Sequence, residues 1–181
     1  MAAMRIPKQL YQQIIDHCKK EYPREACGLV AGVKGLVTAV FSVPNVASDP
    51  YSNYLVDSTV QAELFRLMAA KNWELTAIYH SHPSGAACPS ESDIRQAYYE
   101  DAFMLIVGLH RTKPDVRLYR VQRRRGTYAQ ARLLVLGDRK NGGGTLRPRG
   151  DDGFCRSWSG GKEFQCPTGR LTTMQSVLFP R

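Results

Sequence analysis

Two histidines separated by one residue are the strongest chemical signal in this sequence. His80 and His82 follow an apolar run, residues 75–79, that predicts a β-strand. Alternate side chains leave a strand on the same face, so both imidazoles can reach one ion. Pro83 ends the ladder pairing that a strand needs, and the residues after it predict a loop. The pair therefore predicts a metal site at the end of a strand.

A carboxylate that can join the two histidines stands at the start of the next predicted helix. Ser90 and Asp93 form a Ser-x-x-Asp pattern, which is typical of a helix N-terminus. Asp93 then lies in the first turn of that helix, and the loop before it can fold back toward His80 and His82. Two neutral imidazoles and one carboxylate are a ligand set for a catalytic zinc ion, with the fourth position left to water.

Each part of this pattern also has a simpler interpretation. A His-x-His pair occurs by chance in many strands, and Ser90 with Asp93 is by itself more often a plain helix cap. Cys88, in the loop between the ligands, can be mistaken for a nucleophile. The combination favours the metal site: the order of the residues, the proline directly after the second histidine, the length of the loop, and an upstream acid, Glu25.

The full combination resembles the motif of the JAMM (MPN-plus) metalloprotease family. It consists of Glu25, then His80-Ser-His82-Pro, then Ser90 and Asp93. The segment Glu-Ala-Cys-Gly-Leu-Val-Ala-Gly that begins at Glu25 looks like the segment that carries the family's catalytic glutamate. The whole motif is much more specific than any of its parts.

A second stretch strengthens the resemblance and limits it to one group of the family's members. Asn45 followed by a proline, an aromatic residue and Asp57 before a helix is similar to the short bacterial and archaeal members of the family. The resemblance covers approximately residues 5–136 and does not extend to the rest of the chain.

The resemblance implies a zinc-dependent hydrolase with one zinc ion per chain. His80, His82 and Asp93 would hold the ion, Glu25 would be the general base, and Ser90 would donate a hydrogen bond to the tetrahedral oxyanion. The implied substrate is the peptide or isopeptide bond after the C-terminal Gly-Gly of a ubiquitin-like modifier or a sulfur-carrier protein. The implied leaving group is the amine of a cysteine or a lysine.

The resemblance also implies a single α/β domain of the JAMM/MPN type, which is cytidine-deaminase-like. Its sheet would be mixed and largely antiparallel, flanked by helices. The active site would be open at one edge of the sheet, where the histidine strand meets the helix of Asp93. Periodicity by itself supports only alternating helices and strands.

The elements that must position these residues follow from periodicity and turn signals. A first helix begins near Lys8, and His17 beside its apolar stripe is expected to be a structural histidine at or near the surface. Two further helices are predicted at 59–72 and 90–100. Strands are predicted at Cys27–Val33, Leu36–Val43, 74–79, Phe103–Gly108 and 116–121, with a strand-like segment at 53–56 and either a strand or a short helix at Thr127–Leu136.

The length and composition predict one domain with an appendage. A chain of 181 residues with 43% hydrophobic residues can bury a real core. From residue 137 onward, however, neither helical nor strand periodicity persists, and nine of the fifteen glycines fall there. We therefore expect a metalloprotease domain at 1–136 and a glycine-rich, poorly ordered extension at 137–181.

The charge and the cysteines limit the partners and the compartment. The formal charge of +9 is compatible with an acidic modifier, but the basic residues are dispersed except for Arg123, Arg124 and Arg125. Five cysteines without a Cys-x-x-Cys pair indicate neither a zinc ribbon nor a closed disulfide framework. Neither a membrane span nor a signal peptide is recognisable. We expect a cytoplasmic protein without membrane association; the sequence does not determine its oligomeric state.

Two other functional classes stay open at this point. A non-catalytic scaffold of the same MPN type would normally lack one or more of the site residues, whereas all five are present. A nucleic-acid-associated protein would explain the positive charge. No groove motif of interleaved basic and aromatic residues is visible, however, so nucleic acid is an unlikely partner.

Overall fold

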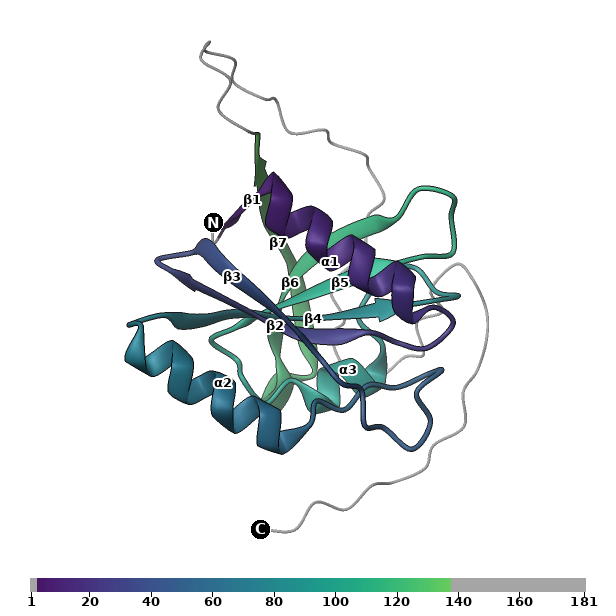
Figure 1. The fold of residues 1–181 in the computed structure, drawn as a ribbon. Helices are drawn as coiled ribbons and strands as arrows, with labels where there is room; N and C mark the ends of the chain where they lie inside the picture. Colours follow the sequence, from purple (N-terminus) through teal and green to yellow (C-terminus); the bar gives the residue numbers. More distant parts are fainter. Residues whose placement is uncertain (1–2, 138–181) are drawn as a thin grey trace.

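The computed structural model describes residues 3–137, so most of the predicted extension, residues 138–181, lies outside the described residues. The described chain contains both helices and strands, interspersed along its length (Figure 1). In order they are β1 (Ala3–Pro7), α1 (Lys8–Glu21), β2 (Cys27–Val33), β3 (Leu36–Val43), α2 (Ser58–Ala70), β4 (Glu74–His82), α3 (Glu91–Gln96), β5 (Phe103–Gly108), β6 (Asp115–Gln122), the 3-10 turn η1 (Arg123–Arg125) and β7 (Thr127–Leu136).

Within residues 3–137 the strands close into a barrel in the order β1-β3-β2-β4-β5-β6-β7. The predicted mixed sheet is confirmed: β1 pairs in parallel with β3 and β7, β4 pairs in parallel with β5, and the other neighbours are antiparallel. The expected open edge at the site is wrong. Strand β4 lies between β2 and β5, so its histidines stand at the end of a fully paired strand rather than at an edge.

Several element boundaries differ from the sequence prediction. Strand β1 was not predicted, because its only pattern is the alternation of buried Met4 and Ile6 within five residues. Strand β4 continues through both histidines, and α3 ends at Gln96 instead of near residue 100. The strand-like segment 53–56 makes only an isolated bridge, Asn45 with Val56, and Thr127–Leu136 is a strand.

Helices α1 and α2 lie on different sides of the strands (Figure 1). Helix α1 places Ile14 and Cys18 in the main core cluster, together with Tyr79 of β4. Helix α2 contributes Met68 to a separate cluster on the other side, against Leu29 of β2. No helix among the described residues is both long enough and apolar enough to cross a membrane.

Tyr79, the residue before the first histidine, joins β4 to α1. Its ring is fully buried, and its hydroxyl lies 2.9 Å from Nδ1 of His17 and donates to Oγ of Ser42 at 3.3 Å. His17 is half-buried and structural, as predicted. On the neighbouring strand Gly28 stands directly opposite Tyr79. A Cβ at this position would lie 2.3 Å from the Phe41 carbonyl oxygen and from Cε1 of Tyr79, so the ring requires a glycine there.

We predict that Gly28→Ala destabilises the protein by about 1–3 kcal/mol, because backbone and a buried ring must shift to admit one methyl group. The midpoint of urea unfolding measures the change. Gly85→Ala is the control: its Cβ would meet nothing closer than Cβ of His82 at 3.4 Å. Equal unfolding midpoints for the two variants would contradict the steric argument.

Candidate metal centre

The end of β4 brings the two histidines to one point. His80 and His82 are two positions apart in a strand whose pairing with β5 is continuous through His82, so their side chains leave on the same face. Their Nε2 atoms lie 3.1 Å apart. His80 is fully buried, and His82 is partly accessible.

Asp93 completes the cluster from α3. Its Oδ1 lies 3.3 Å from Nε2 of His80, and its Oδ2 lies 3.3 Å from Nε2 of His82. One nitrogen from each histidine and one carboxylate oxygen all lie within 4.8 Å of one another. The structure thus brings together the three residues that the sequence predicts as metal ligands.

The two imidazole rings are held in different ways. Nδ1 of His82 lies 2.8 Å from the carbonyl oxygen of Ala86, to which it donates in the tautomer that leaves the Nε2 lone pair facing the cluster. The ring of His80 stacks on Tyr54, with centroids 4.3 Å apart and planes 18° apart. Among the described residues, Nδ1 of His80 has no hydrogen-bond partner. Packing against Tyr54, rather than a hydrogen bond at Nδ1, therefore sets the orientation of His80.

The cluster is electrostatically coupled. Burial alone would raise the pKa of Asp93, but His80 and His82 hold it well below its usual value, so the carboxylate is ionised. Burial lowers the pKa of His80 and keeps this imidazole neutral near pH 7. Burial acts in the same direction on His82, but Asp93 outweighs it and raises the pKa of His82 to about 9. A proton on His82 thus balances the buried carboxylate, and a metal cation must displace that proton to bind.

Ser90 and Asp93 also form the helix cap that their spacing predicts. The backbone N–H of Ser90 donates to Oδ2 of Asp93 at 2.7 Å, and the backbone N–H of Asp93 donates to Oγ of Ser90 at 3.2 Å. The Ser90 hydroxyl donates to the same Oδ2 at 2.7 Å. The cap and the ligand cluster are therefore one arrangement, in which the cap fixes the carboxylate that faces the histidines.

Glu25 lies beside this cluster because of a contact between β2 and β4. Just before β2, the N–H of Ala26 donates to Oγ of Ser81 at 2.9 Å, and the N–H of Ser81 donates to the Ala26 carbonyl at 3.0 Å. Ser81 is thus structural, as predicted. The Glu25 side chain is only 6% exposed. Burial is the largest influence on its pKa and raises it to about 8, although the charge of His82 acts in the opposite direction.

Asn45 holds Glu25 and the following loop together, a role that sequence reasoning missed. Its side-chain N–H groups donate to the carbonyl oxygens of Glu25 at 2.8 Å and of Asn53 at 3.0 Å. Its Oδ1 accepts from the backbone N–H groups of Ala47 and Leu55, both at 3.0 Å. The same loop carries Tyr54. The sequence indicates Asn45 only as part of a loop pattern, because its partners are backbone groups that no sequence motif identifies.

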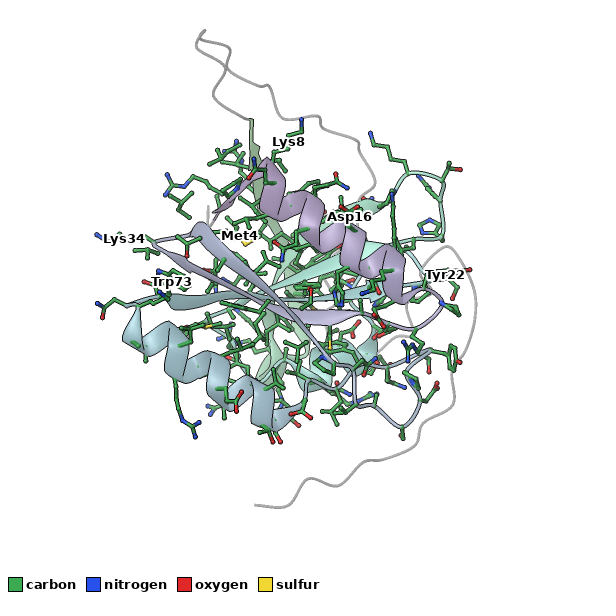
Figure 2. The ribbon with its side chains drawn as sticks, viewed as in Figure 1. Met4, Lys8, Asp16, Tyr22, Lys34 and Trp73 are labelled. Atoms are coloured by element: carbon green, nitrogen blue, oxygen red, sulfur yellow. The ribbon has the colours of Figure 1, made fainter. Side chains whose placement is uncertain are left out.

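A groove of about 1060 Å³ leads to Glu25 along the outside of α1. Lys8 and Asp16, labelled in Figure 2, lie on its helical wall. Pro44 and Asn45 line its other end, together with Glu25. The three predicted ligands do not line it, so Glu25 is the site residue that the groove reaches.

Cys88 does not belong to the metal cluster. It is buried, and its Sγ lies 3.4 Å from the hydroxyl of Tyr128 on β7. The ligands that converge are histidine nitrogens and carboxylate oxygens, with no thiol among them.

Comparisons with known proteins agree with this geometry. A sequence model of a family described as prokaryotic homologs of the JAB domain matches residues 7–122. The probable TtuB-protein conjugate cleaving protease of Thermus thermophilus is 34% identical over 100 residues, which cover 55% of this chain and 67% of that protein. The CysO-cysteine peptidase of Mycobacterium tuberculosis is 30% identical over 119 residues, which cover 64% of this chain and 81% of that protein.

A solved structure supports the fold. Protein DSY2949 from Desulfitobacterium hafniense, determined in solution, superposes with a TM-score of 0.66 at 22% identity. The superposition covers 76% of this chain and 95% of that one. The likeness extends over nearly the whole described domain and concerns the fold alone.

The raised pKa of Glu25 predicts a pH-dependent stability in the metal-free protein. The carboxyl ionises near its ordinary value of 4.5 in the unfolded chain but near 8 in the folded one. The folded state therefore binds more protons between these values, and stability falls as pH rises through this window. We expect Glu25→Gln to gain roughly 2–4 kcal/mol relative to the wild type between pH 5 and pH 8. Urea unfolding with a chelator present measures this gain.

Glu63→Gln, at an exposed position of α2, is the control for this measurement. The difference between its free energy of unfolding and that of the wild type should stay constant over the same pH range. Parallel pH profiles for Glu25→Gln and the wild type would contradict the assignment.

Proposed function

The chain belongs to the family of prokaryotic homologs of the JAB domain, and on that premise we propose that it is a zinc-dependent hydrolase. We infer that it cleaves the amide bond after the C-terminal Gly-Gly of a ubiquitin-like or sulfur-carrier protein. The observation that carries the proposal is the convergence of His80, His82 and Asp93 within 4.8 Å. The names of the two relatives, a conjugate-cleaving protease and a CysO-cysteine peptidase, support this class of bond.

The donor set suits zinc, with one ion per chain. Two imidazole nitrogens and one carboxylate oxygen are typical of catalytic zinc sites that leave a coordination position open. The neutral His80 and the ionised Asp93 are already in the protonation states that a cation requires. When bound, zinc supplies Lewis-acid activation of water and of the scissile carbonyl group.

Glu25 is the proposed general base. It takes a proton from the attacking water, whose oxygen bonds to the carbonyl carbon, and later gives the proton to the leaving amine as the C–N bond breaks. With its pKa near 8, the isolated carboxyl is mostly protonated at neutral pH. A positive charge next to it lowers this pKa, so Glu25 becomes a base only when the neighbouring cluster is occupied.

Ser90 is the proposed donor to the oxyanion. Its side chain is exposed at the first turn of α3, next to the cluster. In the structure its hydroxyl donates to Oδ2 of Asp93, so the role requires the O–H to rotate toward the substrate. One such donor is typically associated with about 2.7–4 kcal/mol of transition-state stabilisation in other hydrolases.

The compartment is a further proposal. Cys18 and Cys27 are buried free thiols within the described chain. Free buried thiols are compatible with a reducing compartment, and we propose that the protein acts in the cytoplasm.

We predict that the purified protein contains about one zinc ion per chain and that His82→Ala loses it, because two ligands cannot retain the ion. Metal analysis after dialysis measures the zinc content. Cys88→Ser is the control and should keep its zinc. Full zinc occupancy in His82→Ala would contradict the ligand assignment.

We predict that Glu25→Gln keeps its zinc but lowers kcat by at least about a hundredfold, because an amide neither accepts nor returns the proton. The substrate is a CysO-type carrier protein with cysteine joined to its C-terminus through an amide bond. Mass spectrometry follows the release of cysteine. Cys88→Ser should cleave at the normal rate.

Either of two results would refute the role of Glu25. One is near-normal cleavage by Glu25→Gln, and the other is loss of zinc in that variant. The base would then have to be another group.

A further inference from the structure

An exposed basic and aromatic surface lies at the end of α3, the helix that carries Asp93. We call it the α3–η1 face; it consists of Arg95, Tyr98, Tyr99, Arg123, Arg124 and Arg125. Tyr98 is 52% exposed and Tyr99 is 42% exposed, although most large apolar side chains of the domain are buried. Arg95 stands two residues after Asp93 on α3 but on the opposite, exposed side of the helix, so α3 connects the buried cluster to this face.

The face is ordered by contacts of its own. The guanidinium of Arg123 lies 4.4 Å from the centroid of the Tyr98 ring, and its Nε donates to the Arg95 carbonyl at 2.8 Å. The backbone N–H of Arg124 donates to Oε1 of Glu100 at 3.3 Å. These contacts hold the three-residue turn η1 against α3, so binding a partner would cost little further ordering of this segment.

The face continues onto α2. The Tyr99 ring packs edge-on against Phe65, with centroids 5.6 Å apart, and its hydroxyl accepts from Nε2 of Gln61 at 3.2 Å. Three elements therefore contribute to one exposed surface around the end of α3. A folded partner needs this kind of broad support, whereas a peptide tail alone does not.

The charge of the face selects the partner. Arg95 is paired with Glu91 at 3.0 Å, but Arg123, Arg124 and Arg125 make no ion pair with any described residue. The three arginines are consecutive in the single turn η1, and exposed charges act over roughly 8 Å in physiological salt. Exposed arginines beside tyrosines are the residue types that dominate protein interfaces.

We propose that the α3–η1 face docks an acidic surface on the folded body of the modifier whose C-terminal tail enters the metal centre. This inference rests on the proposed function. If the leaving group is a single amino acid, as the name CysO-cysteine peptidase indicates for that relative, the modifier body is the only folded surface that the substrate offers. The positive charge then serves to attract and orient that body.

The test measures binding and cleavage separately in R124E/R125E. Labelled CysO and TtuB proteins, each tested as the free carrier, are the binding probes. We expect at least one to bind the wild type, and the variant to bind it at least about tenfold more weakly in 50 mM salt. In 500 mM salt the difference should shrink to about twofold, because salt screens exposed charges. The milder double variant R124Q/R125Q should bind the carrier more weakly than the wild type but more tightly than R124E/R125E.

R5E/K34E is the matched control, since it makes the same change of charge at exposed positions. Lys34 lies at the turn between β2 and β3, apart from α3 (Figures 1 and 2). The affinity of R5E/K34E for the carrier should stay within about twofold of the wild-type affinity. A pentapeptide ending in Gly-Gly-Cys is the control substrate, and R124E/R125E should cleave it with unchanged kcat/KM, because it has no folded body.

The outcomes separate this proposal from the hydrolase assignment. Docking is overturned if neither carrier binds, if R124E/R125E binds normally, or if R5E/K34E loses as much affinity. It is also overturned if R124E/R125E weakens binding to a DNA duplex while carrier binding is unchanged, which would favour a nucleic-acid surface. A carrier that binds through the face, but whose cysteine adduct is never cleaved, would refute the hydrolase and leave docking intact.

Discussion

Two hydrogen bonds between Ala26 and Ser81 are the constraint on which the site depends. They join residues 55 positions apart and tie the start of β2 to the end of β4. Because Ala26 follows Glu25, and Ser81 stands between the two histidines, this one contact brings the proposed base beside the proposed ligands. A strand alternates its faces, so Ser81 can bond to Ala26 while His80 and His82 turn toward Asp93.

The cluster is stable without a metal only because its charges compensate one another. A buried carboxylate costs several kcal/mol unless it is paired and hydrogen-bonded. Asp93 meets this requirement with the Ser90 cap on one side and the two histidines on the other. The Glu25 carboxyl has no such partner among residues 3–137, and burial raises its pKa to about 8, so it is mostly protonated at neutral pH. A bound cation would take the place of the His82 proton and lower the pKa of Glu25.

The loop between β3 and α2 supports both halves of the site. Asn45 binds the Glu25 carbonyl, and Tyr54 stacks on His80. The N–H of Glu25 donates to the carbonyl of Pro50, in the same loop, at 2.7 Å. The loop therefore positions the proposed base and one ligand together, and a change in its conformation would move both.

The sequence by itself determined the three residues that converge at the proposed metal site and most of the elements that carry them. His-x-His before a proline, and Ser-x-x-Asp at a helix start, are local patterns set by strand alternation and by capping, so they can be recognised without the fold. The first helix and the strands Cys27–Val33, Leu36–Val43 and Phe103–Gly108 followed from periodicity for the same reason.

Only the tertiary structure decided what depends on contacts between distant residues. Closure of the barrel rests on β1, five residues long, which pairs with β3 and β7 and has too short a pattern to be recognised. The roles of Asn45 and Tyr54 depend on a backbone carbonyl and on a ring that come from other elements. The raised pKa of Glu25 arises from burial among those elements, and burial is a property of the folded chain rather than of any residue in it.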